Sequence, residues 1–155
     1  TNVSGIFSYL QEIYDETKNP EDGRVKVDIC WEKGELYAEE NLLKTVLINL
    51  TDNAIKASEE GQTVEITGRR MENGYYFQVR DEGIGIPEEE IYKITEAFYM
   101  VDKSRSRAHN GAGLGLALCT AILELHHSHL KIESTLGVGS CMSFLIPDEG
   151  VKADE

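Results

Sequence analysis

Four short motifs follow one another along this chain, and their order constrains the fold more than any one of them does. They are NLTDNAIKAS (Asn49 to Ser58), DEGIGIP (Asp81 to Pro87), GAGLGLAL (Gly111 to Leu118) and GVGS (Gly137 to Ser140). The first lies in a helical pattern, the second ends a strand pattern, and the other two are glycine-rich turns. This succession predicts a domain in which helices and strands share one core.

Hydrophobic periodicity predicts the elements around these motifs. Helical patterns cover residues 3–17, 39–58 and about 114–127. Strand patterns cover residues 63–68, 75–81, 130–133 and 141–146. A further strand is expected at Val25 to Ile29, with Leu36 to Ala38 as its hairpin partner. We expect an α/β (α+β) two-layer sandwich, with a mixed, mainly antiparallel sheet of about five strands and three main helices on one face.

The composition is that of a soluble globular protein. The 155 residues, 41% apolar and 28% charged, suffice for one domain with its own core, and no apolar run approaches the length of a membrane span. The net charge of −13 argues against nucleic acid or an anionic membrane as a partner. Cys30, Cys119 and Cys141 lack metal-ligand spacing and are expected to be buried free thiols in a reducing cytoplasm.

Three polar residues share one stripe of the longest helical pattern. Asn49, Asn53 and Lys56 stand at i, i+4 and i+7, beside an apolar face. Amide oxygens suit a hard cation, and an ammonium group suits phosphate. A solvated polar face remains an equal alternative for this helix taken alone.

A carboxylate ends an apolar strand row. Phe77, Val79 and Asp81 alternate along the strand, so the Asp81 carboxylate is expected at the rim of the core. There it can accept a hydrogen bond from an exocyclic amine, which would distinguish adenine from guanine. Gly83 and Gly85 then allow a tight turn close to a flat ligand. The alternative is a turn-forming Asp-Glu-Gly without a ligand.

Glycine and basic residues precede the last helical pattern. Gly111, Gly113 and Gly115 stand where a helix N-terminus would favour phosphate. Upstream basic residues could reach the same phosphates or form a charged loop without a role; they are Lys103, Arg105 and Arg107. Three histidines follow at the end of this helical pattern, but no metal is expected there; they are His126, His127 and His129.

Taken together, the motifs make the chain resemble the catalytic, ATP-binding domain of bacterial sensor histidine kinases, in the GHKL superfamily of ATPases and kinases. NLTDNAIK resembles the N box of that family, and DEGIGIP resembles its G1 box. EAFYMVDKSRSR (Glu96 to Arg107) resembles the F box and the ATP lid. GAGLGLAL resembles the G2 box, and GVGS with the FLIP ending resembles the last glycine turn and strand. The resemblance covers roughly residues 25–147.

The resemblance implies roles for individual residues. Asn53 would hold Mg²⁺, Asn49 would support the metal-phosphate region, Lys56 would contact phosphate, and Asp81 would bind the adenine amino group. Phe98 would anchor the lid hinge. The further nucleotide-binding residues would be Gly83, Gly85, Ile86, Tyr99, Gly111, Gly113, Leu114, Gly115 and Leu116. The residues serving phosphoryl transfer would be Asn49, Lys56, Lys103, Arg105 and Arg107.

Two departures from the family pattern matter. Many relatives have Arg where this chain has Met100, so the phosphate contact falls to one of the three basic lid residues. His129 lacks the sequence context of the phosphoacceptor, so the acceptor hairpin is expected before Thr1.

The chain is expected to divide into three segments. Residues 1–20 would be a helical connection from that hairpin, residues 21–149 the ATP-binding domain, and residues 150–155 an acidic tail.

The resemblance implies an ATP-dependent protein histidine kinase. The γ-phosphoryl group would pass to a histidine on a separate dimerisation domain, and then to the receiver domain of a response regulator. Three rivals stay open: an ATP hydrolase of the gyrase and chaperone type, a serine kinase of the anti-sigma type, and a non-catalytic nucleotide-binding module. The first two are disfavoured because Asn49 stands where such enzymes carry a water-activating glutamate.

Overall fold

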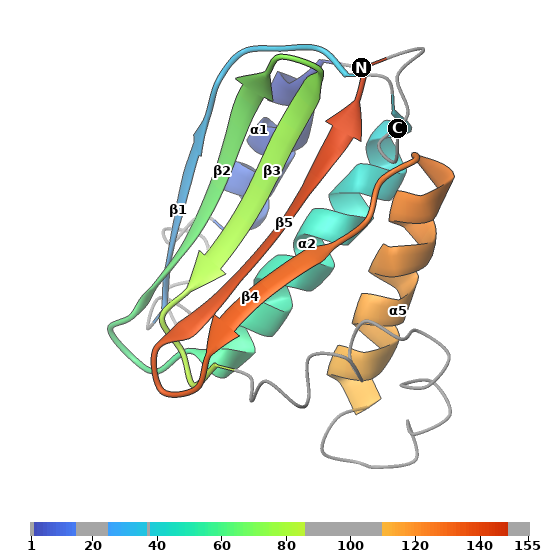
Figure 1. Ribbon diagram of the computed structural model, residues 1–155. Helices are drawn as coiled ribbons and strands as arrows, with labels where there is room; N and C mark the ends of the chain where they lie inside the picture. The colour runs from blue at the N-terminus through green and yellow to red at the C-terminus, as the bar shows by residue number, and fades with distance from the viewer. Residues whose placement is uncertain (1, 15–24, 37, 86–109, 149–155) are drawn as a thin grey trace.

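The computed structural model describes residues 2–14, 25–36, 38–85 and 110–148, and of these it describes 110–115 by their backbone alone. Its elements are α1 (Val3–Ile13), β1 (Lys26–Trp31), α2 (Glu40–Ala57), β2 (Thr63–Met71), β3 (Gly74–Asp81), α5 (Asn110–Leu125), β4 (Lys131–Thr135) and β5 (Gly139–Pro147) (Figure 1). No helix in these ranges is long and apolar enough to cross a membrane.

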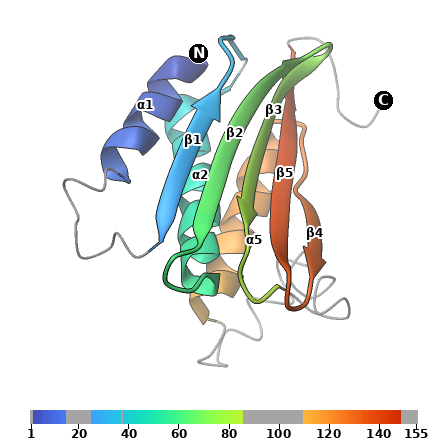
Figure 2. The same ribbon diagram turned by 90° about the vertical axis from the view of Figure 1, so that its left-hand side faces the viewer.

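The strands form one mixed sheet in the order β1-β2-β3-β5-β4. The pair β1–β2 is parallel, and the other three pairs are antiparallel. All three described helices lie on the same face of this sheet, as the two views show (Figures 1 and 2). The predicted two-layer α/β sandwich with a mainly antiparallel sheet is therefore confirmed.

The hairpin expected at the start of the sheet is wrong. β1 pairs in parallel with β2, Ile29 opposite Ile66, and α2 lies between these two strands in the chain. Of the expected partner segment, Leu36 is buried in the core, and the adjacent Glu35 forms an isolated bridge with Asn2. Burial of Leu36 explains its apolar character without strand pairing; residue 37 lies outside the described residues.

The core lies between the sheet and the helices. Four apolar residues of α1 are buried: Val3, Ile6, Phe7 and Leu10. The strand residues that face the helices are also apolar. Aromatic rings stack in the centre of the core: the ring centroids of Phe7 and Trp31 are 5.1 Å apart, and those of Phe77 and Phe144 are 5.0 Å apart. Helix α1 thus belongs to the same core as the sheet, while the predicted division of the chain into segments stays a prediction.

The three thiols are free, but only one is buried. Cys119 is buried on α5, Cys141 is partly buried, and Cys30 is exposed. The expectation of three buried thiols is therefore wrong for Cys30. The reason is the period of two in β1, which places Cys30 with Lys26 and Asp28 on the face away from the helices.

Candidate functional site

The candidate site begins where β3 ends, at Asp81. This residue terminates a row of buried side chains that includes Phe77 and Val79, and it is itself only 8% exposed. Its Oδ1 accepts hydrogen bonds from the backbone N–H groups of Gly83 at 2.8 Å and Ser140 at 3.3 Å. Burial raises the pKa of Asp81, and the two N–H groups oppose that shift. The hydrogen bonds among described residues thus fall on Oδ1 and leave Oδ2 for a ligand.

The turn after Asp81 passes close to other backbone and has no room for side chains. A Cβ on Gly83 would lie 2.2 Å from the carbonyl oxygen of Ala57, and one on Gly85 would lie 2.2 Å from that of Thr135. Gly85 also has a φ of +77°, which favours glycine. The turn is therefore a closely packed wall of the candidate site, formed by the motif expected to make a tight turn there.

Two hydrogen bonds hold this turn between separate elements. The N–H of Ile84 donates to the carbonyl oxygen of Ala57 at the end of α2, at 3.2 Å. The carbonyl oxygen of Ile84 accepts from the N–H of Gly137 in the β4–β5 turn, at 2.7 Å. The turn formed by GVGS is therefore part of the same wall.

The polar stripe of α2 contains one unsatisfied buried amide. Asn53 is half-buried, and its Nδ2 is a buried atom without a hydrogen-bond partner among the described residues. Such an atom costs free energy unless a ligand satisfies it. Lys56 on the same stripe is exposed. The alternative of a solvated polar face therefore suits Lys56 and does not suit Asn53, whose buried Nδ2 is a donor that an acceptor of a ligand would satisfy.

Asn49 is placed at the contact between α2 and α5. Burial raises the pKa of the Cys119 thiol to about 12. The side chain of Asn49 forms a hydrogen bond with this thiol, and that bond acts in the opposite direction on the pKa. The Cys119 thiol also donates to the carbonyl oxygen of Val46 at 3.7 Å. Asn49 therefore ties α2 to α5, the helix that contains the GAGLGLAL motif.

The glycine motif GAGLG lies within the first turns of α5. The helix begins at Asn110, earlier than the predicted start near residue 114, so Gly111, Gly113 and Gly115 have helical backbone. This is the end of a helix that favours phosphate. Leu116 is 3% exposed and belongs to the core. The side chain of Leu114 lies outside what the structure describes.

Several predicted site residues lie outside the described ranges. They are Ile86, Phe98, Tyr99, Lys103, Arg105 and Arg107, with the departure at Met100. Their roles stay predictions.

The Ser140 N–H and the Ala57 carbonyl oxygen contribute to the candidate site but were not predicted from the sequence, because main-chain groups carry no signal in side-chain identity. In the described part of the chain, no cluster of His, Cys, Asp and Glu side chains could hold a metal ion.

A comparison of the sequence with models of protein families identifies the family of this chain. The model described as histidine kinase-, DNA gyrase B- and HSP90-like ATPase matches residues 38–150. The chain belongs to this family. Among curated members, the phosphate regulon sensor protein PhoR of Haemophilus influenzae is 44% identical over 112 residues, covering 72% of this chain and 26% of that protein. The sensor histidine kinase WalK of Bacillus subtilis is 36% identical over 125 residues, covering 78% of this chain and 20% of that protein.

Solved structures of family members have the same fold. The nucleotide-free catalytic domain of histidine kinase ThkA superposes with a TM-score of 0.76 at 26% identity, covering 96% of this chain and 95% of that one. Full-length ShkA, solved in complex with AMPPNP, gives 0.76 at 25% identity, covering 99% of this chain and 31% of that one. ThkA has also been solved in complex with the response regulator protein TrrA. The present chain is thus a catalytic, ATP-binding domain of the sensor histidine kinase type, and it spans about a quarter or less of these two curated relatives' length.

Proposed function

We propose that this domain binds Mg-ATP and transfers the γ-phosphoryl group to a histidine on the dimerisation and phosphoacceptor domain of the same kinase, for relay to a response regulator receiver domain. The observation that carries the proposal is the buried Asp81 carboxylate, which has one oxygen engaged by two backbone N–H groups. An acceptor fixed in this way matches the N6 amine of adenine and mismatches the O6 of guanine.

The α2 stripe fits the phosphate end of the nucleotide. The buried Nδ2 of Asn53 has no partner among the described residues, so it suits a site where this nitrogen donates to a phosphate oxygen, while the amide oxygen would hold Mg²⁺. Mg²⁺ would supply neutralisation of charge on the transferring phosphate. Lys56 is exposed and free to reach phosphate. Lys103, Arg105 and Arg107 would add positive charge from the lid.

The chemical step would break the bond between the γ-phosphorus and the oxygen bridging to the β-phosphate. A bond from an imidazole nitrogen of the acceptor histidine to phosphorus would form, and ADP would leave. This domain's residues bind and orient the nucleotide, while the nucleophile comes from the acceptor domain. Asn49 is an amide held against Cys119, and an amide cannot activate water, which favours transfer over the ATP hydrolase alternative.

The partners follow from the proposed reaction. They are ATP and ADP, the acceptor domain and the receiver domain; the AMPPNP complex of ShkA and the TrrA complex of ThkA support these choices. A net charge of −13 disfavours nucleic acid and direct membrane contact by this domain. The domain would work in the cytoplasm, including as the cytoplasmic part of a membrane-anchored sensor.

Titration calorimetry tests nucleotide binding. ATP and ADP should bind, GTP should bind far more weakly, and Asp81→Ala should abolish the preference for adenine. Asn53→Ala should weaken Mg-ATP binding more than binding of ATP in excess EDTA, since only the former uses the amide oxygen as a metal ligand. Equal affinity for ATP and GTP would contradict the role of Asp81, and equal losses with and without Mg²⁺ would contradict that of Asn53.

Labelled ATP tests the transfer. Incubated with γ-labelled ATP, the 155-residue chain should neither release phosphate rapidly nor label itself. Addition of the acceptor hairpin of the parent kinase should give a phosphohistidine that is acid-labile and base-stable. Rapid phosphate release would favour the hydrolase alternative. Binding without transfer to the hairpin would favour the non-catalytic module.

A further inference from the structure

His126 joins the end of α5 to the start of α2. Its Nε2 accepts a hydrogen bond from the backbone N–H of Glu39 at 3.1 Å, and its Nδ1 lies 2.8 Å from the carbonyl oxygen of Ile122. A carbonyl oxygen only accepts, so Nδ1 carries the proton and Nε2 is bare. The two partners thus fix His126 as the neutral Nδ1-protonated tautomer.

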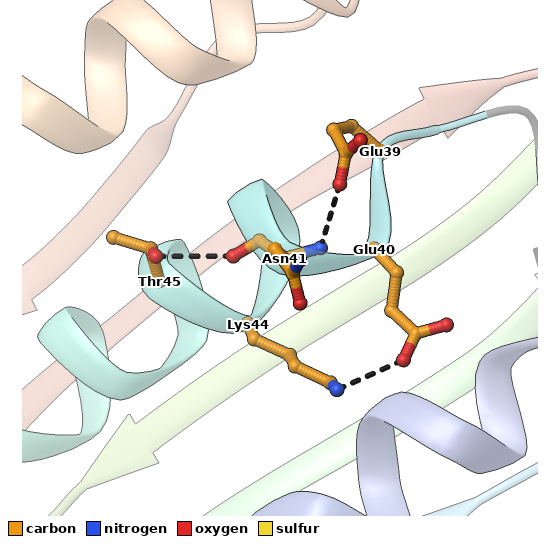
Figure 3. A network of polar contacts seen from close by, with 5 residues as sticks. All are labelled: Glu39, Glu40, Asn41, Lys44 and Thr45. Atoms are coloured by element: carbon orange, nitrogen blue, oxygen red, sulfur yellow. Dashed lines mark hydrogen bonds and ion pairs between the residues drawn. The ribbon is translucent and has the colours of Figure 1, made fainter.

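The Glu39 N–H takes its acceptor from outside α2. Glu39 is the N-cap of this helix, and its carboxylate caps the N–H of Asn41 at 3.0 Å (Figure 3). The N–H of an N-cap residue has no acceptor within its helix and is often satisfied by Glu or Gln at the third helical position. That position here is Leu42, which cannot accept. His126 of the neighbouring helix takes the acceptor role instead.

A second polar contact joins the same two helices further along. The Cys119 thiol donates to the carbonyl oxygen of Val46. Val46 is seven residues after Glu39, and Cys119 is seven residues before His126, about two helical turns in each case. The two contacts therefore define an antiparallel register between α2 and α5. Figure 1 shows these two helices side by side.

The next step in this register reaches the candidate site. Seven residues beyond Val46 stands Asn53, whose buried Nδ2 has no partner in the part of the chain that the structure describes. Seven residues before Cys119 stands Ala112, between Gly111 and Gly113 in the first turn of α5. Extended by one more step of seven residues, this register therefore sets Asn53, the proposed metal ligand, level with Ala112 in the proposed phosphate-binding turn.

We propose that His126 is a positioning residue for nucleotide binding, acting through the register of α2 against α5. The inference rests on the proposed function, since it concerns how the ATP site is assembled. His126 lies two such steps from Asn53, and its two hydrogen-bond partners among the described residues, Glu39 and Ile122, belong to α2 and α5 rather than to the proposed nucleotide site. Its contribution is the hydrogen bond from Glu39, which opposes sliding of one helix along the other.

Three variants of the 155-residue chain test the proposal by AMPPNP binding with Mg²⁺, measured well below the melting temperature. His126→Leu removes the bond to Glu39 and should weaken binding on the order of five-fold, the equivalent of one hydrogen bond. His126→Gln keeps an acceptor at the position of Nε2 and should restore affinity to within about two-fold. His129→Leu, an exposed control, should bind as the parent chain does.

The outcomes separate the two proposals. If the parent chain binds no AMPPNP, the proposed function fails. If the parent binds and His126→Leu binds equally well with a lower melting temperature, His126 is merely structural and the positioning role is overturned. If the Gln variant binds as poorly as the Leu variant, the Glu39 hydrogen bond is not the cause, and the proposal is again overturned.

A second pair of variants serves if His126→Leu does not fold. Glu39→Pro removes the donor N–H at a residue whose φ of −85° is close to that of proline, while Glu39→Ala removes the capping carboxylate and keeps the N–H. The proline variant should bind AMPPNP more weakly than the alanine variant; equal affinity would overturn the proposal. Nitrogen NMR of the parent chain at pH 8 should show His126 protonated on Nδ1, and the opposite tautomer would also overturn it.

Discussion

The backbone nitrogen of Gly83 lies 2.8 Å from Oδ1 of Asp81, two residues earlier in the chain. This bond closes a short turn around the carboxylate, and the N–H of Ser140 approaches the same oxygen from β5. The carboxylate is therefore held in place before any ligand arrives, at the cost of being taken out of water. That cost has a consequence for stability.

Asp81→Asn should reveal this cost in the pH dependence of unfolding. Burial raises the pKa of Asp81 above its ordinary value of 3.8, so the folded state binds the proton more tightly than the unfolded state. The corresponding stability is present below the unfolded pKa and is lost as pH rises through the folded pKa. The asparagine variant keeps the Oδ1 acceptor and does not ionise.

Relative to the parent, the Asp81→Asn free energy of unfolding should therefore rise across that window and level off towards neutral pH. Urea unfolding of both chains from pH 3.5 to 7 measures the difference. A difference that is flat with pH, or that falls, would contradict a buried and destabilised carboxylate.

Gly83→Ala should destabilise the fold by at least about 2 kcal/mol, because the added methyl would meet the Ala57 carbonyl oxygen at 2.2 Å. The matched control is Gly5→Ala within α1, where the nearest atoms are 3.7 Å or more away. Alanine there should stabilise by about 0.5–1 kcal/mol through helix propensity. Chemical denaturation of both variants gives the comparison, and a tolerated Gly83→Ala would mean that the turn is not a close-packed wall.

His127→Gly should stabilise the protein by about 0.5–1 kcal/mol. His127 has a φ of +60° after the end of α5. The N–H of His127 bonds to the carbonyl oxygen of Glu124, and that of Ser128 to Leu123, the pattern of a helix end that favours glycine. Glu124→Gly inside the helix should instead destabilise by about 1 kcal/mol. Thermal melting distinguishes the two, and a lower melting temperature for His127→Gly would refute backbone strain at this position.

Tyr14→Phe should destabilise the contact between the end of α1 and α2 by about 1 kcal/mol. The Tyr14 hydroxyl donates to Oδ1 of Asp52 at 2.9 Å, and burial together with the nearby Asp52 charge raises the pKa of Tyr14. Tyr9→Phe is the control, since Tyr9 is 43% exposed. Hydrogen exchange of the α1 amides should speed up in Tyr14→Phe and stay unchanged in the control; equal exchange in all three chains would show that the hydroxyl contributes nothing.

The sequence predicted features that depend on side-chain pattern. The row Phe77, Val79, Asp81 placed a carboxylate at the rim of the core because a strand alternates with a period of two, and burial of all three confirms that placement. The two glycines after Asp81 were expected to shape a tight turn, and the close approach of backbone at Gly83 and Gly85 bears this out.

Features that depend on long-range partners were not predictable in this way. The alternation in residues 25–29 fits a parallel strand as well as a hairpin, so the pairing of β1 with β2 could not be read from it. The His126 contact with Glu39 joins residues 87 positions apart, and histidines at a helix end have an ordinary explanation in helix electrostatics. Main-chain donors such as the Ser140 N–H carry no sequence signal at all.

The place of β5 in the sheet sets an order of assembly. Among the described strands this one comes last in sequence, yet it lies between β3 and β4 and supplies the Ser140 N–H that reaches Asp81. A nascent chain that ends before Gly139 has no described strand to pair with β4 and leaves one side of β3 unpaired, so the described sheet closes only after residues 139–147 have been made. Ribosome-bound chains stopped before and after residues 139–147 should differ sharply in protease resistance, and equal resistance would show that the sheet closes without its last strand. Until that strand is in place, the newly made chain is expected to need protection of its exposed edges and to be unable to engage nucleotide.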